Sequence, residues 1–226
     1  MSNIAGKRVL ITGASSGIGL SLAEQLANAG HQVTITVRDA EKAESTKAAL
    51  AEKQVSVDVV HIDFSIWSSV LAGVDEIIQN KMLCGASWPR WKLPKEASAW
   101  ADAFAPRTRS GWRAYALSKF AITLLASRLN RVEDVTAVAV NPGNAITNVS
   151  KNMPDRHRKM LAVFKKTLIT VEEAAANVVR ASLNPLPAGK FYDQSKTSSL
   201  PKALTSERYM HNLNHLAQQL VLELSQ

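Results

Sequence analysis

A glycine-rich turn near the start of the chain constrains the fold more than any other feature. Residues 9–12 are an apolar run that predicts a buried strand, and residues 18–29 have apolar side chains at helical spacing. Glycines between a strand and a helix allow a tight turn, close approach of a pyrophosphate, and packing of the helix on the strand. The helix N-terminus then favours an anion. We therefore predict that the turn T-G-A-S-S-G-I-G at residues 12–19 binds a dinucleotide through Gly13, Ser15, Ser16, Gly17, Ile18 and Gly19.

The segments after this turn alternate between strand and helix patterns. We expect strands at residues 32–37, 55–62 and 74–78, and a helix at residues 39–53. This alternation predicts a doubly wound parallel α/β sheet of the Rossmann type, with the chain forming a single domain over residues 1–226. The remaining expected elements are helices at 112–131 and 205–224, strands at 135–140 and 189–192, and a helix to Leu183 that opens with a capping box at Thr170 and Glu173.

Composition excludes several other classes of protein. With 46% hydrophobic and 20% charged residues, the 226-residue chain is neither disordered nor a coiled coil. Its one cysteine, Cys84, excludes a disulfide framework and a cysteine-based zinc site. Residues 1–7 lead directly into an apolar strand without a signal-peptide pattern, and no apolar run could span a bilayer, so we expect a cytoplasmic protein. The net charge of +8 favours an anionic partner, but no nucleic-acid recognition motif accompanies it.

Two charged residues follow the predicted strands and bear on the choice of cofactor. Arg38 is the first charged residue after residues 32–37, and a basic residue there accommodates the 2′-phosphate of NADP, whereas an acidic one favours NAD. We therefore favour NADP(H) over NAD(H). In the alternative, Arg38 is a solvated loop residue and Asp39 binds the ribose. Asp63 ends the third predicted strand, where it would lie beside the adenine or serve as an ordinary strand-end cap.

Tyr115 and Lys119 lie four residues apart in the expected helix at 112–131, on one face of it. An ammonium group lowers the pKa of a neighbouring phenol. The pair could therefore protonate a carbonyl or deprotonate an alcohol during hydride transfer. The spacing is common by itself and gains weight from the glycine turn and from the later Pro142-Gly143.

These motifs resemble those of the short-chain dehydrogenase/reductase family. Residues 12–19 match that family's T-G-x-x-x-G-x-G, residues 115–119 its Y-x-x-x-K, and N-P-G-N-A-I-T at residues 141–147 resembles its N-P-G-x-V-x-T. The tail, with G-K-F-Y at residues 189–192 before Lys196 and a last helix, resembles the retinol-dehydrogenase-like branch. The resemblance implies roles at the cofactor for Pro142, Gly143 and Thr147. It also implies that Tyr115 is the acid–base group and that Lys119 binds the nicotinamide ribose.

The chain departs from the family between the fourth strand and the tyrosine. Where the family carries N-N-A-G, residues 79–82 read Q-N-K-M, which retains Asn80 for the cofactor. Only 34 residues, 81–114, then precede Tyr115, and a helix with its next strand takes roughly 30. We therefore predict that one helix is shortened or missing, and in the more extreme case one strand as well. Ser87 is the candidate for the family's carbonyl-polarising serine, with Ser98 and Ser110 as rivals.

The expected function is hydride transfer between NADP(H) and an apolar alcohol or carbonyl substrate. The alternative is a catalytically impaired relative that binds a nucleotide or a partner protein. A third hypothesis is a serine hydrolase, because G-A-S-S-G at residues 13–17 matches G-x-S-x-G; it would need Asp134 with His211 or His215.

Three further patterns leave alternatives open. His211 and His215 have zinc-binding spacing but no evident third ligand, so no metal is expected. The basic segment 151–166 fits a substrate lid, a membrane-surface helix or a solvated helix. The tryptophans of the shortened region either cover core or form an aromatic wall around an apolar substrate; they are Trp88, Trp91, Trp100 and Trp112. The oligomeric state is not specified by the sequence.

Overall fold

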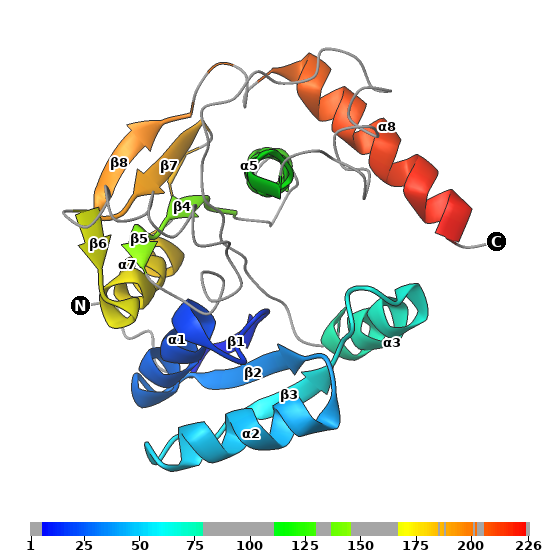
Figure 1. Cartoon of the computed structure of the whole chain (residues 1–226). Helices are drawn as coiled ribbons and strands as arrows, with labels where there is room; N and C mark the ends of the chain where they lie inside the picture. Colours follow the sequence, from blue (N-terminus) through cyan, green and yellow to red (C-terminus); the bar gives the residue numbers. More distant parts are fainter. Residues whose placement is uncertain are drawn as a thin grey trace. The chain divides into compact units, whose positions relative to one another are not determined.

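The computed structural model describes residues 6–78, 111–129, 137–145, 167–184, 186–187, 189–200, 202 and 206–224 (Figure 1). The chain divides into two compact units. The first comprises Met1–Cys84 and Pro142–Leu183, and the second comprises Gly85–Asn141 and Asn184–Gln226. Each unit is therefore assembled from two separate stretches of the sequence.

A three-stranded parallel sheet forms the base of the first unit. Its strands are β1 (Arg8–Ile11), β2 (Gln32–Val37) and β3 (Asp58–His61). The helices that follow them are α1 (Gly17–Asn28), α2 (Ala40–Ala51) and α3 (Trp67–Ile78). β2 lies between β1 and β3, with Ile35 paired to both Ile11 and Val59. Parallel neighbours require a crossover, and α1 and α2 provide it, so the Rossmann-type α/β class is confirmed.

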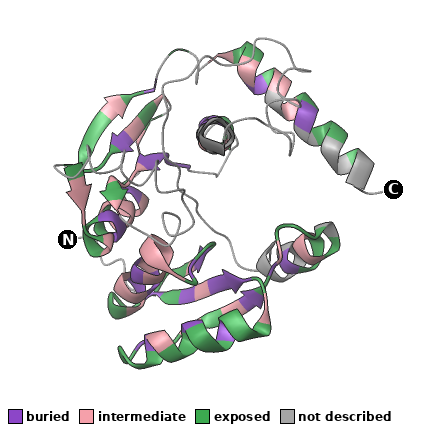
Figure 2. Ribbon diagram, in the orientation of Figure 1, coloured by how far each residue is buried: buried purple, intermediate pink, exposed green. Residues whose placement is uncertain are grey.

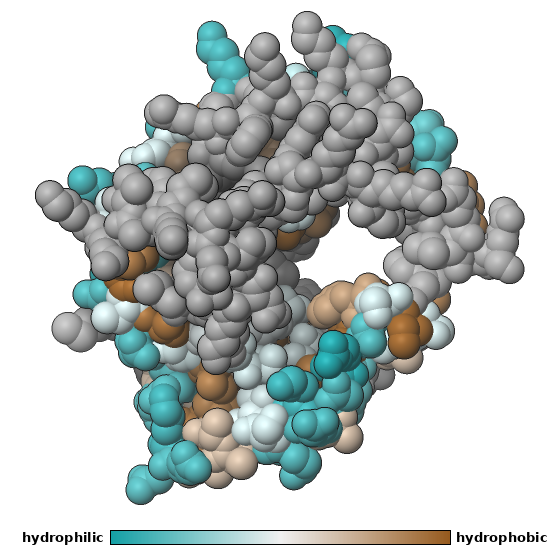
Figure 3. Space-filling view, viewed as in Figure 1, coloured by the Kyte–Doolittle hydropathy of each residue, from teal (hydrophilic) through white to brown (hydrophobic). Residues whose placement is uncertain are grey.

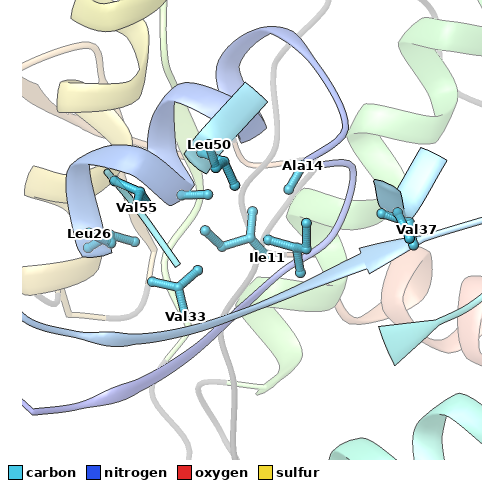
Figure 4. Close-up of a cluster of buried hydrophobic side chains, with 10 residues drawn as sticks. Ile11, Ala14, Leu26, Val33, Val37, Leu50 and Val55 are labelled. Atoms are coloured by element: carbon cyan, nitrogen blue, oxygen red, sulfur yellow. The ribbon is translucent and has the colours of Figure 1, made fainter. Parts of the chain in front are cut away.

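The core of this unit is built on alternate residues of β2. Val33, Ile35 and Val37 share one face of the strand and are at most 3% exposed. Leu26 of α1 and Leu50 of α2 join them in one buried cluster (Figure 4). Each such side chain contributes roughly 1.5–3 kcal/mol when it is fully buried. The same cluster thus fixes both helices against the strand.

α2 shows how the sequence separates a buried from an exposed face. Its buried residues are Ala43, Thr46 and Leu50, which recur at helical spacing. The outer side of α2 is exposed in Figure 2 and hydrophilic in Figure 3. In α3 and the turn before it, by contrast, three large hydrophobic side chains are exposed: Phe64, Ile66 and Leu71.

The prediction of a fourth strand at residues 74–78 is wrong, because these residues form the C-terminal part of α3. A five-residue apolar run fits a strand and a buried helix segment equally well. The spacing of Val70, Val74 and Ile77 continues the helical pattern. Gly73 permits the helix to approach the end of β3, since a β-carbon at Gly73 would lie 2.3 Å from Cγ1 of Ile62.

A later stretch of the sequence completes the first unit. It contains β5 (Asn144–Ala145), β6 (Leu168–Ile169) and α7 (Val171–Leu183). The predicted capping box is confirmed: the Thr170 N–H donates to Oε2 of Glu173 at 2.9 Å, and the Glu173 N–H donates to Oγ1 of Thr170 at 3.0 Å. The parallel pair of β5 and β6 was not predicted.

α7 packs against α1. Val179 of α7 contacts the core cluster, and Nε2 of Gln25 in α1 donates to the carbonyl of Glu172 at 3.0 Å. A helix encoded far along the chain therefore supports the helix that follows the glycine turn.

The second unit combines two helices with a small sheet. Its elements are α5 (Gly111–Leu129), β4 (Val140–Asn141), β7 (Lys190–Asp193), β8 (Lys196–Ser199) and α8 (Glu207–Leu224). Both predicted helices and the strand at β7 are confirmed within a few residues. The strand expected at 135–140 reaches only β4 among the described residues, and β8 was not predicted.

Packing inside the second unit connects α5 with α8. The rings of Phe120 and Tyr209 meet edge to face, with centroids 6.2 Å apart and an interplanar angle of 84°. Arg128 also donates a hydrogen bond to Asn214. No helix in the described part of the chain is long and apolar enough to cross a membrane.

Candidate cofactor-binding site

Three glycines of the turn between β1 and α1 meet two structural demands, one of backbone conformation and one of packing. Gly13 and Gly17 have φ angles of 70° and 58°, in the left-handed region that favours glycine. Gly19, inside α1, is packed against the start of the turn. A β-carbon at Gly19 would lie 2.4 Å from the carbonyl oxygen of Gly13 and 2.9 Å from Cα of Ala14. The turn is therefore tight and closely packed, as a dinucleotide-binding turn requires.

The N-terminus of α1 is open to an anion. Ser16 precedes the helix with extended backbone, and its side chain makes no capping hydrogen bond. Across the described residues, no other side chain donates or accepts a hydrogen bond at this helix start. The first-turn N–H groups of Gly17, Ile18 and Gly19 and the helix dipole can thus act on a phosphate. Ser15 is exposed beside them.

Arg38 and Asp39 form an ion pair directly after β2. Nε of Arg38 donates to Oδ2 of Asp39 at 3.0 Å, and Oδ1 of Asp39 accepts the Lys42 N–H at 2.8 Å. The Lys42 N–H and Arg38 hold the pKa of the Asp39 carboxyl below its usual range, and Asp39 raises the pKa of the Arg38 guanidinium. Asp39 is the N-cap of α2, so both of its carboxylate oxygens already have partners.

Asp63 caps the turn between β3 and α3. Its Oδ1 accepts the hydroxyl of Ser65 at 2.6 Å and the N–H of Ser65 at 2.8 Å. Its own N–H donates to Oγ of Ser69 at 2.9 Å. The hydrogen bonds from Ser65 lower the pKa of the Asp63 carboxyl, and the charge of Arg38 contributes further. The capping role proposed as the simpler alternative is thus present; a role beside the adenine remains a prediction.

The first unit collects most of the predicted cofactor residues. The glycine turn, Arg38 and Asp63 follow β1, β2 and β3, and the carboxyl ends of parallel strands share one edge of a sheet. Pro142 and Gly143 precede β5 in the same unit, with Gly143 at φ 104°. Nδ2 of Asn177 in α7 donates to the carbonyl of Pro142 at 3.0 Å. Sequence reasoning missed Asn177, whose partner lies 35 residues away.

The predicted acid–base pair belongs to the second unit. Tyr115 and Lys119 both lie in α5, one helical turn apart, as their spacing predicted. Lys119 is partly buried, and its backbone carbonyl accepts a hydrogen bond of 2.9 Å from the Thr123 hydroxyl. The helix thus provides the backbone that a tyrosine–lysine pair requires.

Several predicted residues lie outside the described residues. They are Asn80, Ser87, Ser98, Ser110, Asp134, Thr147, the tryptophans at 88, 91 and 100, and the basic segment 151–166. The roles assigned to them remain predictions, as does the shortening of residues 81–114.

The structure gives no support to the hydrolase and zinc hypotheses. A nucleophile elbow places its serine on a strained backbone. In the described part of the chain, the non-glycine residues with positive φ are Gln54 and Gln194, so Ser15 lacks a left-handed backbone. His211 and His215 are exposed on α8, and no group of three or more metal-ligand side chains occurs among the residues that the structure describes.

Comparison with known proteins agrees with this arrangement. The family model of the short chain dehydrogenases matches residues 7–82. A fatty acyl-CoA reductase of Acinetobacter baylyi is 35% identical over 82 residues, which cover 33% of this chain and 28% of the reductase. A short chain dehydrogenase of Aspergillus sclerotiorum is 40% identical over 83 residues, covering 35% of this chain and 23% of that protein. The match therefore spans less than a third of these relatives.

Solved structures extend the likeness in fold to most of the chain. The L-sorbose reductase of Gluconobacter frateurii, complexed with NADPH and L-sorbose, has a TM-score of 0.57 at 19% identity and covers 84% of this chain and 96% of its own. A short chain dehydrogenase of Burkholderia cenocepacia in complex with NADP has a TM-score of 0.58 at 20% identity, with coverages of 85% and 98%. The chain is thus similar to the short chain dehydrogenases over residues 7–82, and it shares the fold of these solved reductases and dehydrogenases over most of its length.

Proposed function

We propose that the chain binds NADP(H) in its first unit and transfers a hydride between this cofactor and an apolar alcohol or carbonyl substrate. One observation carries the proposal. Gly19 is packed against Gly13 with no room for a β-carbon, at the start of a helix whose N-terminus has no side-chain cap. A turn of this construction accepts the pyrophosphate of a dinucleotide. The family model that matches residues 7–82 and the oxidoreductases that match about a third of the chain support the same class of reaction.

The preference for NADP(H) rests on Arg38. Its side chain is 66% exposed, and among the described residues only its Nε is paired. The two terminal guanidinium nitrogens can therefore form bidentate hydrogen bonds to a 2′-phosphate. Asp39 already has partners on both oxygens, which makes it a weaker acceptor for ribose hydroxyls. The neighbours solved with NADPH and NADP are in keeping with this choice.

In the proposed mechanism, side chains of the protein donate and accept the proton that accompanies hydride transfer. When bound, the nicotinamide supplies or accepts the hydride. The Tyr115 hydroxyl gives its proton to the carbonyl oxygen in reduction and takes it back from the alcohol in oxidation. The Lys119 ammonium, one helical turn away, would favour the phenolate form of Tyr115. Ser87 is the proposed donor that polarises the substrate carbonyl.

The test compares Tyr115→Phe with Tyr209→Phe, a matched loss of one hydroxyl on α8. NADPH binding is followed by thermal shift and turnover by NADPH absorbance over a panel of apolar aldehydes and ketones. Tyr115→Phe should bind NADPH as the unaltered protein does and lose turnover by about 10²–10⁴-fold. Tyr209→Phe should retain turnover. Unchanged turnover in Tyr115→Phe would contradict the proposed chemistry.

A second candidate is a dinucleotide-binding protein without turnover. The observation that favours it is the helical state of residues 74–78, where the family's fourth strand was expected. This candidate requires a thermal shift with NADPH and no turnover of any substrate in the panel. Steady carbonyl reduction that depends on Tyr115 would exclude it.

A further inference from the structure

A chain of hydrogen bonds joins α7 to the turn at Pro142 and Gly143. Nη1 of Arg180 donates to Oδ1 of Asn177 at 3.3 Å, and Nδ2 of Asn177 donates to the carbonyl of Pro142 at 3.0 Å. All three residues belong to the first unit. Because the Arg180 guanidinium can only donate, the Asn177 atom that faces it must be the amide oxygen. The amide nitrogen of Asn177 therefore faces the Pro142 carbonyl.

This arrangement fixes the direction of one peptide group. The peptide group between Pro142 and Gly143 is planar. Fixing the Pro142 carbonyl therefore also fixes the orientation of the Gly143 N–H. Gly143 has a φ of 104°, a conformation that glycine adopts at little cost and that local sterics do not enforce. The turn therefore depends on an external contact for its shape, and the partly buried amide of Asn177 is such a contact.

The same helix also supports the glycine turn. α7 packs on α1 through Val179, and Gln25 of α1 donates to the Glu172 carbonyl. α1 begins at Gly17, within the glycine turn itself. One helix is thus bonded or packed to two segments that the sequence places at the cofactor.

We infer that Asn177 is a positioning residue for the dinucleotide: α7 holds the turn at Pro142 and Gly143 in register with the glycine turn, and Asn177 contributes to this through its hydrogen bond to the Pro142 carbonyl. The inference rests on the proposed function, since it concerns how that cofactor site is held. Asn177 acts on the cofactor through Pro142 and Gly143. Losing its donor should loosen the turn and weaken dinucleotide binding while α7 remains folded.

The experiment uses two variants of Asn177 and one control on the same helix. Asn177→Asp keeps the size of the side chain and an oxygen that can accept from Arg180, but it has no N–H to donate to Pro142. Asn177→Ala removes both hydrogen bonds. Ser182→Ala is the matched control, because it deletes a partly buried side-chain bond of 2.9 Å within α7. Each protein is assayed for NADPH affinity by fluorescence titration and for hydrogen exchange of residues 137–145 without cofactor.

Both Asn177 variants should raise the Kd for NADPH by about tenfold, the size of one lost hydrogen bond to a partly buried carbonyl. They should also speed exchange at residues 142–145, whereas Ser182→Ala should leave both quantities within about twofold. NADPH affinity equal to that of the unaltered protein in Asn177→Asp would overturn the inference, whatever its exchange. If the unaltered protein binds neither NADPH nor NADH, the proposed function fails and the inference fails with it.

Discussion

Gly19 faces the carbonyl oxygen of Gly13 at a distance that leaves no room for a side chain. A β-carbon on Gly19 would stand 2.4 Å from that oxygen, which belongs to the backbone and cannot rotate away. Gly13 itself has open space around its α-carbon, but its φ of 70° disfavours other residues. The two glycines are thus required for different physical reasons, one steric and one conformational.

Substituting the two glycines should separate these reasons. We expect Gly19→Ala to lower the free energy of unfolding by about 1–3 kcal/mol through overpacking, although alanine favours helices by about 1 kcal/mol. Gly13→Ala should cost about 1–2 kcal/mol from backbone strain alone. Urea unfolding of both variants measures these values. A Gly19→Ala protein more stable than the unaltered one would show that the turn is not closely packed.

Arg38→Gln should reduce the affinity for NADPH and leave the affinity for NADH nearly unchanged. The guanidinium would contribute a charge-assisted bond to the 2′-phosphate, so the preference for NADPH should fall by about 10–100-fold. Titration of both dinucleotides measures the ratio. Lys47→Gln, an exposed change on α2, is the control for general loss of positive charge. Equal losses for NADPH and NADH would place Arg38 away from the phosphate.

Asp63 should make the first unit sensitive to acid. Hydrogen bonds from Ser65 lower the pKa of Asp63 when the protein is folded. Because the folded pKa lies below the unfolded one, the stabilisation is fully present above the unfolded pKa, about 3.9, and is lost as pH falls through the folded pKa. The Tm difference between the unaltered protein and Asp63→Asn should therefore be constant from about pH 6 to 7 and shrink below about pH 4. A difference that does not change with pH would exclude the carboxylate as its source.

Gln54→Gly should stabilise the chain by about 1 kcal/mol. Gln54 has a φ of 60° where α2 ends, and the N–H groups of Gln54 and Val55 donate to the carbonyls of Ala51 and Leu50. This is a Schellman motif, in which glycine is preferred at the left-handed position.

The end of α1 provides the matched comparison for Gln54. There Gly30, with φ 82°, donates to Ala27, and His31 donates to Leu26, in the same pattern of bonds. Gly30→Gln should destabilise the protein by about as much as Gln54→Gly stabilises it. Thermal unfolding of both variants tests the pair, and shifts of equal sign would contradict the argument.

The features that the sequence predicted correctly are those that depend on near neighbours. The glycine turn spans residues 12–19, and the bonds of the capping box join residues three apart. Helical spacing of apolar residues identified α1, the capping box identified α7, and helices were also expected at α2, α5 and α8. Residues 74–78 were misassigned because an apolar run this short has no period that separates strand from helix.

The features that the sequence could not predict depend on distant partners. β5 and β6 are two residues each and pair across 24 positions, Asn144 with Leu168, so neither contains a pattern of its own. Asn177 reaches Pro142 across 35 positions, and an asparagine inside a helix is not distinguished by sequence. The placement of Tyr115 and Lys119 on one helix was predicted from their spacing, and their role in acid–base chemistry stays a prediction.

The packing of α7 on α1 has a consequence for how the protein is made. α1 ends at Asn28 and α7 begins at Val171, so a ribosome adding about 5–20 residues per second makes α7 roughly 7–29 s after α1. During that interval Val179 and the rest of α7 cannot yet pack against α1 and the core cluster. A nascent chain in this state is exposed to aggregation, and factors that shield emerging apolar segments should act before residue 183 leaves the tunnel.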